Sequence, residues 1–258
     1  MVKNLILHIL KTPYYIGKGI YLLGKKIKQK NIEGKIKKTR EEMEAKYGSI
    51  KVIESIEGNY QLWEKELLKL ESKIGIILGA RGSGKTAVGV KLLENIYARQ
   101  KTKCYAMGFN ESEMPSWIEV IEDISQIKNN SNILIDEGGI LFSSRKSMSK
   151  PNQLLSELIL ISRHKNLNIL FISQNSSNLD VNILRQADFL ILKPTSLLQK
   201  DFERKKIKDV YEKVEKKFNK YKKEQGLAYV YSKEFQGFIS NPLPSFWSAK
   251  ISKSFREK

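Results

Sequence analysis

The sequence has only one cysteine, Cys104, and only two histidines, His8 and His164, among its 258 residues. A single thiol excludes an intrachain disulfide and gives no sign of an oxidising compartment. With so few soft ligands, a zinc site of the usual kind is not expected. Magnesium binds oxygen ligands and often arrives with phosphate groups, so it remains compatible with this composition.

Long apolar runs are also missing. The most apolar stretch, 5–23, is interrupted by Lys11, Pro13 and Lys18, and no run reaches the roughly 18 to 20 apolar residues that a membrane-spanning helix needs. Residues 24–26, Gly-Lys-Lys, do not resemble the cleavage site of a signal peptide. We expect an amphipathic segment that lies on a membrane or a partner protein. A helix packed on the protein's own core is an equal alternative.

Acidic residues are scarce relative to basic ones. The chain has 28 Asp and Glu against 46 Lys and Arg, which gives a formal net charge of +18. Such an excess predicts a polyanionic partner, either nucleic acid or an anionic membrane surface. Lysine, isoleucine and asparagine are all abundant, so an AT-rich genome is an alternative source of part of this charge.

A glycine-rich octapeptide follows the apolar run 74–78 and precedes a helical pattern. It consists of Gly79, Ala80, Arg81, Gly82, Ser83, Gly84, Lys85 and Thr86. This is a G-x-x-x-x-G-K-T phosphate-binding loop in the strand–loop–helix setting that the motif requires. Its N–H groups and the helix N-terminus attract anions, Lys85 reaches the β- and γ-phosphates, and the Thr86 hydroxyl ligates Mg²⁺. We therefore predict binding of a nucleoside triphosphate, ATP, together with Mg²⁺.

Two further apolar runs end in polar side chains. The run 133–135 is followed by Asp136 and Glu137. Neighbouring side chains at a strand end point in different directions. We expect Asp136 beside the magnesium and Glu137 at the attacking water as general base. The run 168–173 ends in Gln174, which we expect near the γ-phosphate as a neutral sensor, with an ordinary solvent-facing strand end as the alternative.

From residue 74 onward, short apolar runs alternate with helical patterns, which is typical of a parallel α/β sheet. We expect strands at 74–78, 103–107, 132–135, 168–173 and 189–192, helices at 87–100, 114–121, 153–164, 181–185 and 200–224, and a hairpin over 228–239. We divide the chain into an amphipathic, basic N-terminal segment (1–48), a P-loop ATPase domain (49–240) and a basic tail (241–258).

The segment 163–174, Arg-His-Lys-Asn-Leu-Asn-Ile-Leu-Phe-Ile-Ser-Gln, resembles HerA–FtsK superfamily ATPases, in which an arginine at a helix end precedes a glutamine-tipped strand. With the phosphate loop and 133–137, the resemblance covers 74–192, under half of the chain. Within that superfamily it is most similar to zonula-occludens-toxin-like ATPases of filamentous phages and to genome-packaging ATPases of membrane-containing viruses. The resemblance implies a RecA-like P-loop NTPase of the ASCE class, with helices on a parallel sheet, here carrying a helical basic N-terminal segment.

The resemblance also implies residue roles. It places Lys85 and Thr86 on phosphate and magnesium, pairs Asp136 with Glu137, and makes Gln174 the sensor. Arg163 is the first candidate for an arginine finger that reaches a neighbouring subunit's site, and Arg185 is the second. A surface salt bridge is the alternative for either arginine.

The family motor is a ring, usually a hexamer, that passes double-stranded DNA through its centre. The leading hypothesis is therefore an oligomeric ATPase that packages a viral or mobile-element genome, in the cytoplasm or associated with the virion. The alternative is a membrane-associated ATPase, peripheral on the bilayer, that assembles or extrudes a virion. A nucleotide-dependent switch is a third hypothesis, which Glu137 disfavours because a switch needs no general base. No DNA-orienting winged-helix domain is recognisable, which disfavours long-range chromosome pumping.

Overall fold

The computed structural model describes residues 22, 25, 27–69, 71–137, 151–248 and 250–251, without the side chains of 151–155 and 197. The strands are β1 (Lys51–Gly58), β2 (Lys73–Leu78), β3 (Lys103–Met107), β4 (Ile118–Ile121), β5 (Ser131–Asp136), β6 (Leu167–Ser173), β7 (Phe189–Leu192), β8 (Leu227–Ser232) and β9 (Phe235–Ser240). The helices are α2 (Tyr60–Leu68), α3 (Lys85–Gln100), α5 (Pro151–Lys165), α6 (Val181–Gln186), α7 (Leu197–Asp201) and α8 (Lys205–Lys220).

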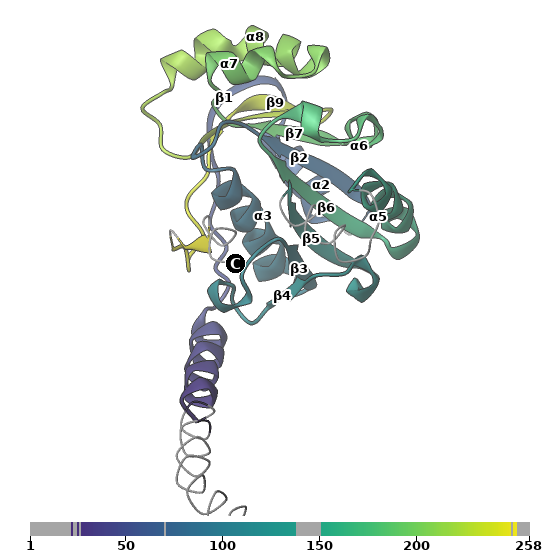
Figure 1. Cartoon of the computed structure of the whole chain (residues 1–258). Helices are drawn as coiled ribbons and strands as arrows, with labels where there is room; N and C mark the ends of the chain where they lie inside the picture. Colours follow the sequence, from purple (N-terminus) through teal and green to yellow (C-terminus); the bar gives the residue numbers. More distant parts are fainter. Residues whose placement is uncertain are drawn as a thin grey trace, which may run out of the picture.

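One sheet, in the order β1-β9-β8-β7-β2-β6-β5-β3-β4, forms the centre of the molecule (Figure 1). The six strands β7, β2, β6, β5, β3 and β4, in this order, all run parallel to one another. The strand that leads into the phosphate loop, β2, lies between β7 and β6, and β6 separates it from β5. This order is that of a RecA-like P-loop fold and confirms the predicted fold class. The carboxyl ends of β2, β6 and β5 consequently meet at one edge of the sheet.

The sheet continues as an antiparallel extension. β8 pairs with β7 and β9, and the β8–β9 hairpin was predicted. The edge strand β1 pairs with β9 and was not predicted. Most of its side chains are exposed, so the backbone ladder with β9, rather than an apolar pattern, holds it in place.

Two hydrophobic layers cover the sheet, α2 and α3 on one face and α5, α6 and α8 on the other (Figure 1). β2 serves both layers: Ile76 packs toward the α5 face and Ile77 toward α3. Helix α3 lies so close to the sheet that a Cβ on Gly89 would come within 2.8 Å of Leu134 Cδ1. This contact fixes the helix that starts in the phosphate loop against β5 and β6.

Two predicted helices are corrected by the structure. The helix expected at 114–121 is wrong: Ile118–Ile121 form the strand β4, and Cys104 of β3 pairs with Ile118. The single helix expected at 200–224 is divided into α7 and α8. The break is stabilised by Glu203, whose buried carboxylate accepts the Ser176 N–H, and by Arg204, whose guanidinium donates to the carbonyls of Ser176 and Leu179.

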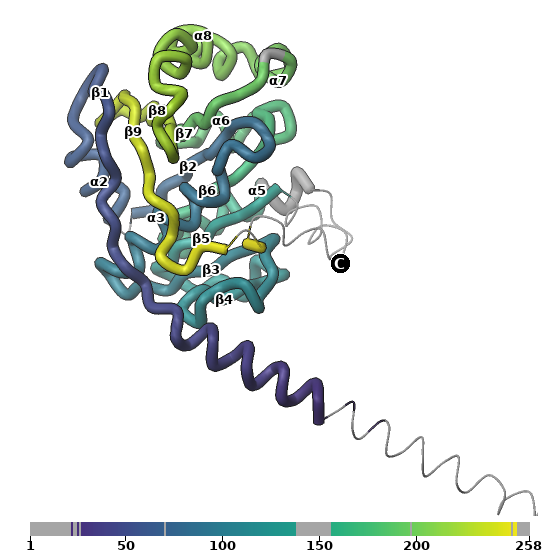
Figure 2. The backbone as a smooth tube through the Cα atoms, turned by 90° about the vertical axis from the view of Figure 1, so that its left-hand side faces the viewer, coloured from purple at the N-terminus to yellow at the C-terminus, as the bar shows by residue number. Residues whose placement is uncertain are grey.

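Residues 27–42 form a helix that projects from the body of the molecule (Figures 1 and 2). The apolar run 5–23 lies outside the described residues, apart from Leu22. No helix in the described ranges is both long and apolar enough to cross a membrane. We assigned residues 43–48 to the N-terminal segment from the sequence, but they lie on α3. The Lys46 N–H donates to the Glu94 carboxylate, and the Gly48 N–H donates to the Asn95 side-chain oxygen.

Candidate nucleotide site

The phosphate loop connects β2 to α3. Gly79, Gly82 and Gly84 have φ values of 149°, 79° and 89°, a region that side-chain-bearing residues rarely adopt. Gly84 is the N-cap of α3 and has no side chain to cap it. The first N–H groups of the helix therefore remain available to an anion, and the helix dipole favours negative charge there.

The Lys85 side chain turns back into this loop. Its ammonium donates to the carbonyl oxygens of Gly79 and Ala80 at 2.8 and 2.9 Å, and the residue is buried. Burial lowers the pKa of Lys85, and the carboxylates of Asp136 and Glu137 oppose this shift. Phosphate oxygens would give this ammonium charged acceptors, which bind more strongly than neutral carbonyls.

Asp136 is the last residue of β5 and Glu137 follows it, at the same edge of the sheet. Burial raises the pKa of Asp136 to about 6, and the Glu137 carboxylate adds to this effect while Lys85 opposes it. Glu137 is held differently: its Oε2 lies 2.8 Å from the Ser173 hydroxyl and 3.3 Å from the Gln174 backbone nitrogen, both of which donate. The structure thus gives the two adjacent, half-buried carboxylates different surroundings: Asp136 lies near Lys85, and Glu137 is oriented by the end of β6.

Gln174 lies directly after β6. Its backbone N–H donates to Glu137, and its carbonyl accepts from the side-chain amide of Gln199 in α7. Sequence reasoning singled out neither Ser173 nor Gln199. No motif points to Gln199, because its contact depends on how α7 folds back over the end of β6.

Arg163 and Arg185 lie away from this cluster. Arg163 is in the last turn of α5, before β6, and Arg185 is in the last turn of α6, before β7. Both side chains are exposed. β6 has seven residues, so it separates Arg163 from the loop edge by about 20 Å at about 3.3 Å per residue. Neither arginine therefore belongs to the phosphate site of its own chain.

Lys193 is a buried cation beside the loop that sequence reasoning missed. It follows β7, and its N–H donates to the Leu78 carbonyl at 2.7 Å. Its ammonium donates to the Gly226 carbonyl at 2.9 Å and to Asn241 Oδ1 at 3.3 Å, and burial lowers its pKa to about 8. A Cβ on Gly79 would lie only 2.6 Å from Lys193 Cβ, which explains why glycine is needed there.

The described part of the chain holds no preformed cage of side chains for magnesium. Within the described ranges, no group of three or more His, Cys, Asp or Glu side chains converges in a way that could hold a metal. The predicted ligands, Thr86 at the start of α3 and Asp136 at the end of β5, would therefore share the ion with phosphate oxygens, as Mg²⁺ in nucleotide sites commonly does.

No protein-family model and no curated protein matches the chain. Among solved structures, it is similar to B204, the DNA-packaging ATPase from Sulfolobus Turreted Icosahedral Virus (16% identity, 68% of this chain and 100% of that chain, TM-score 0.48). It is also similar to the pCW3 conjugation coupling protein TcpA (12% identity, 73% of this chain and 65% of that chain, TM-score 0.45). A third similar structure is that of EssC ATPases 2 and 3 from Geobacillus thermodenitrificans (10% identity, 72% of this chain and 43% of that chain, TM-score 0.41). By its strand order and its phosphate loop the chain is a RecA-like P-loop protein, and it resembles ATPases of the HerA–FtsK type.

Proposed function

We propose that this chain hydrolyses ATP and uses the energy to move double-stranded DNA, as a ring of identical subunits, a hexamer, that packages a viral or mobile-element genome. The observation that best supports the proposed ATP hydrolysis is the orientation of the Glu137 side chain. The hydroxyl of Ser173 and the N–H of Gln174 both donate to one of its oxygens, which orients this carboxylate next to Asp136 and near Lys85.

In this mechanism, Lys85 and the loop N–H groups bind the β- and γ-phosphates, and Thr86 and Asp136 hold the magnesium that neutralises their charge. Water attacks the γ-phosphorus, its proton passes to Glu137, and the bond to the β-phosphate oxygen breaks to give ADP and phosphate. The hydrogen bonds from Ser173 and Gln174 hold the Glu137 carboxylate in a fixed orientation, as a general base requires.

The positions of the two candidate arginines support the proposed ring. Arg163 and Arg185 lie at the edge of the sheet opposite the phosphate loop, so a cation from either position would serve the site of a neighbouring subunit. A trans arginine adds positive charge where the transition state gains negative charge. This arrangement makes hydrolysis depend on assembly, as a motor that coordinates its subunits requires.

DNA as the substrate is supported by the net charge of +18. Phosphate contacts made by lysine and arginine release counterions, so affinity should be independent of sequence and should fall steeply with salt. The test is the rate of ATP hydrolysis, with and without double-stranded DNA, on protein whose oligomeric state is measured by light scattering. We expect DNA to stimulate hydrolysis several-fold in the oligomer. Hydrolysis that DNA does not change would count against the DNA motor.

The projecting helix favours a second candidate, a membrane-associated ATPase for virion assembly or extrusion. Ile27 and Ile32 are 60% and 48% exposed, and they alternate with lysines on an arm that points away from the body (Figure 2). Apolar insertion next to basic residues is a two-part signal for anionic bilayers. Because Arg40 donates to the Met114 carbonyl and pairs with Glu111, and residues 43–48 contact α3, the informative deletion removes residues 1–39 only. Loss of co-sedimentation with anionic liposomes, at unchanged melting temperature, would support membrane attachment, and equal binding by both forms would exclude it.

A further inference from the structure

Helix α8 carries a set of exposed lysines on one side, which we call the lysine face: Lys205, Lys206, Lys213, Lys216 and Lys220. At about 3.6 residues per turn, they fall within an arc of about 100° around the helix axis. Lys206, Lys213 and Lys220 form one row along the helix, which spans about 21 Å at about 1.5 Å per residue. α8 lies at the end of the molecule away from the projecting helix (Figure 1).

The opposite side of α8 is packed on the sheet. Ile207, Tyr211 and Val214 are buried and belong to the hydrophobic layer that also contains α5 and α6. This packing fixes the rotation of the helix about its own axis. The lysine face is therefore held outward in one orientation.

Lysines on the two flanks of α8 are ion-paired, whereas the lysine face is not. Lys208 pairs with Asp201 of α7 at 2.9 Å, and Lys217 pairs with Glu54 of β1 at 2.5 Å. In the part of the chain that the structure describes, no member of the lysine face forms an ion pair. Its charge is therefore not used to hold α8 against its neighbours.

Helix stability does not account for the lysine face either. α8 has no acidic residue in its first turn, and Lys205 and Lys206 lie there, beside the positive end of the helix dipole, where cations are unfavourable. Asp209 and Glu212 are the acidic residues on or next to this face, and they offset fewer charges than the five lysines supply. The lysine face thus keeps an excess of positive charge that an external polyanion would neutralise.

Duplex DNA fits this face better than a lipid bilayer does. DNA presents one phosphate charge per about 1.7 Å of its axis, so a row of about 21 Å lies against about twelve of them. A membrane-bound helix needs apolar side chains that are free to enter the lipid, whereas those of α8 are buried beneath it. The exposed Leu198 and Phe202 lie on α7, which flanks α8 at the Lys208–Asp201 pair, away from the row of lysines.

The α7–α8 segment is also joined to the end of β6. The side-chain amide of Gln199 in α7 donates to the Gln174 carbonyl. At the start of α8, the Arg204 N–H donates to the Ser176 hydroxyl at 2.9 Å. A ligand on the lysine face would therefore be attached to a segment that contacts the predicted γ-phosphate sensor.

We propose that the lysine face of α8 binds the phosphate backbone of double-stranded DNA. The proposal rests on the proposed function, since it names the surface that holds the substrate of the motor. It assigns the contact with DNA to one helix rather than to the basic surface of the chain as a whole. It also gives the bound DNA a short path of hydrogen bonds to Gln174.

The experiment measures how tightly the full chain binds a labelled DNA duplex of arbitrary sequence, by fluorescence anisotropy over a series of salt concentrations. The row variant combines Lys206→Gln, Lys213→Gln and Lys220→Gln. Glutamine has nearly the helix propensity of lysine, so the substitutions remove charge and keep the helix.

The matched control loses the same charge at three exposed lysines on other elements. It combines Lys65→Gln on α2, Lys101→Gln after α3 and Lys233→Gln in the β8–β9 turn. Single substitutions of Lys213 provide a second comparison. Lys213→Glu places a negative charge in the middle of the row, whereas Lys213→Gln only removes the positive one.

We expect the row variant to bind DNA at least about tenfold more weakly than the wild type at low salt. The slope of log affinity against log salt should become shallower by at least about 0.9, the contribution of one phosphate contact. The control should stay within about threefold of the wild type, because salt screens charges that do not touch the DNA. Lys213→Glu should weaken binding more than Lys213→Gln, and this pair decides the outcome if circular dichroism shows the row variant to be unfolded.

Equal affinity and equal slope for the row variant, the control and the wild type would overturn the proposal and leave the DNA motor intact. A wild type that does not bind duplex DNA would overturn the motor and the proposal with it. Vesicles of phosphatidylserine and phosphatidylcholine are the second probe. A row variant that loses the vesicles but keeps the affinity for DNA would assign the lysine face to a membrane and overturn the proposal.

Discussion

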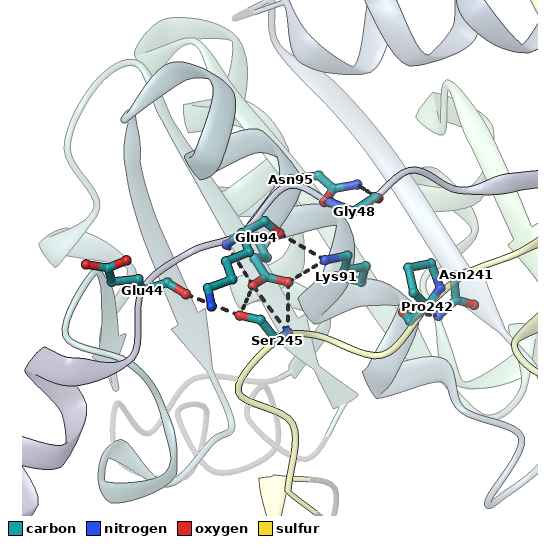
Figure 3. Close-up of polar contacts among 9 residues, drawn as sticks. Glu44, Gly48, Lys91, Glu94, Asn95, Asn241, Pro242 and Ser245 are labelled. Carbon is teal, nitrogen blue, oxygen red and sulfur yellow. Dashed lines mark hydrogen bonds and ion pairs between the residues drawn. The ribbon is translucent and has the colours of Figure 1, made fainter.

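The ammonium of Lys91 and the carboxylate of Glu94 form an ion pair of 2.7 Å on α3, with side chains only 4% and 0% exposed (Figure 3). Glu94 also accepts the N–H of Lys46 in residues 43–49, the N-terminal strap, and the N–H and hydroxyl of Ser245 in residues 240–245, the C-terminal strap. Lys91 donates to the Lys46 carbonyl at 3.0 Å. One buried pair, on the helix that begins in the phosphate loop, therefore holds both straps.

Removing the acid should destabilise the protein strongly. Glu94→Ala leaves the Lys91 ammonium buried without its counter-ion and takes the acceptor from both straps. We expect the free energy of unfolding, measured in urea, to fall by about 3–5 kcal/mol. The control is Glu41→Ala, in an exposed pair with Lys37 on the projecting helix, where the change should stay below about 1 kcal/mol. Similar effects of the two substitutions would show that the straps are not held by this pair.

Substitutions of Lys85 and of Glu137 should affect ATP binding and hydrolysis differently. Lys85→Ala removes the ammonium of the loop, so ATP binding and hydrolysis should both be lost. Glu137→Gln keeps the shape of the side chain and should leave ATP binding intact while hydrolysis slows by at least about a hundredfold. Calorimetry and steady-state kinetics separate the two effects. A Glu137→Gln protein that hydrolyses ATP near the wild-type rate would disprove its role as general base.

Asp136 makes stability depend on pH. Burial raises its pKa from the ordinary 3.8 to about 6. The folded state therefore binds the proton more tightly than the unfolded state. The resulting stabilisation is fully present below pH 3.8 and is lost as the pH rises through about 6. The shift of about two pKa units corresponds to about 3 kcal/mol.

Asp136→Asn should therefore raise the free energy of unfolding of the nucleotide-free, Mg²⁺-free protein at pH 7.5 by about 2–3 kcal/mol. The gain should shrink as the pH is lowered through about 6. The same substitution should abolish hydrolysis, because it removes the predicted magnesium ligand. Urea unfolding at several pH values measures the effect. A variant less stable than the wild type at pH 7.5 would contradict the raised pKa of Asp136.

Arg163→Ala should leave ATP binding nearly unchanged and lower hydrolysis by roughly a thousandfold, if the arginine acts on a neighbouring subunit. Mixing this protein with Lys85→Ala protein creates interfaces where an intact Lys85 site faces an intact Arg163, so part of the activity should return. Arg185→Ala is the comparison for the second candidate. Mixed oligomers without any recovery would rule out the trans role, and full activity of Arg163→Ala alone would move the assignment to Arg185.

The sequence predicted the parallel core because each of its strands is a short apolar run that is buried on both faces, as Ile76 and Ile77 show. The phosphate loop and the two carboxylates at the end of β5 have local sequence patterns that can be recognised without the fold. β1 was missed because an edge strand held by backbone pairing needs little apolar pattern. β4 was predicted as part of a helix because its two buried residues, Ile118 and Ile121, are three positions apart, a spacing that also fits one face of a helix. The contacts of Gln199, Lys193 and Ser245 join segments that are far apart along the chain, so no local sequence pattern predicts them.

The most direct test of the proposed motor is ATP-driven movement along DNA. A third strand bound to double-stranded DNA as a triplex would be displaced by a protein that translocates past it. We expect the oligomer to displace the third strand with ATP, and the Glu137→Gln protein to bind the same DNA without displacing it. Hydrolysis of ATP by the oligomer on this DNA, with the third strand left in place, would contradict the account.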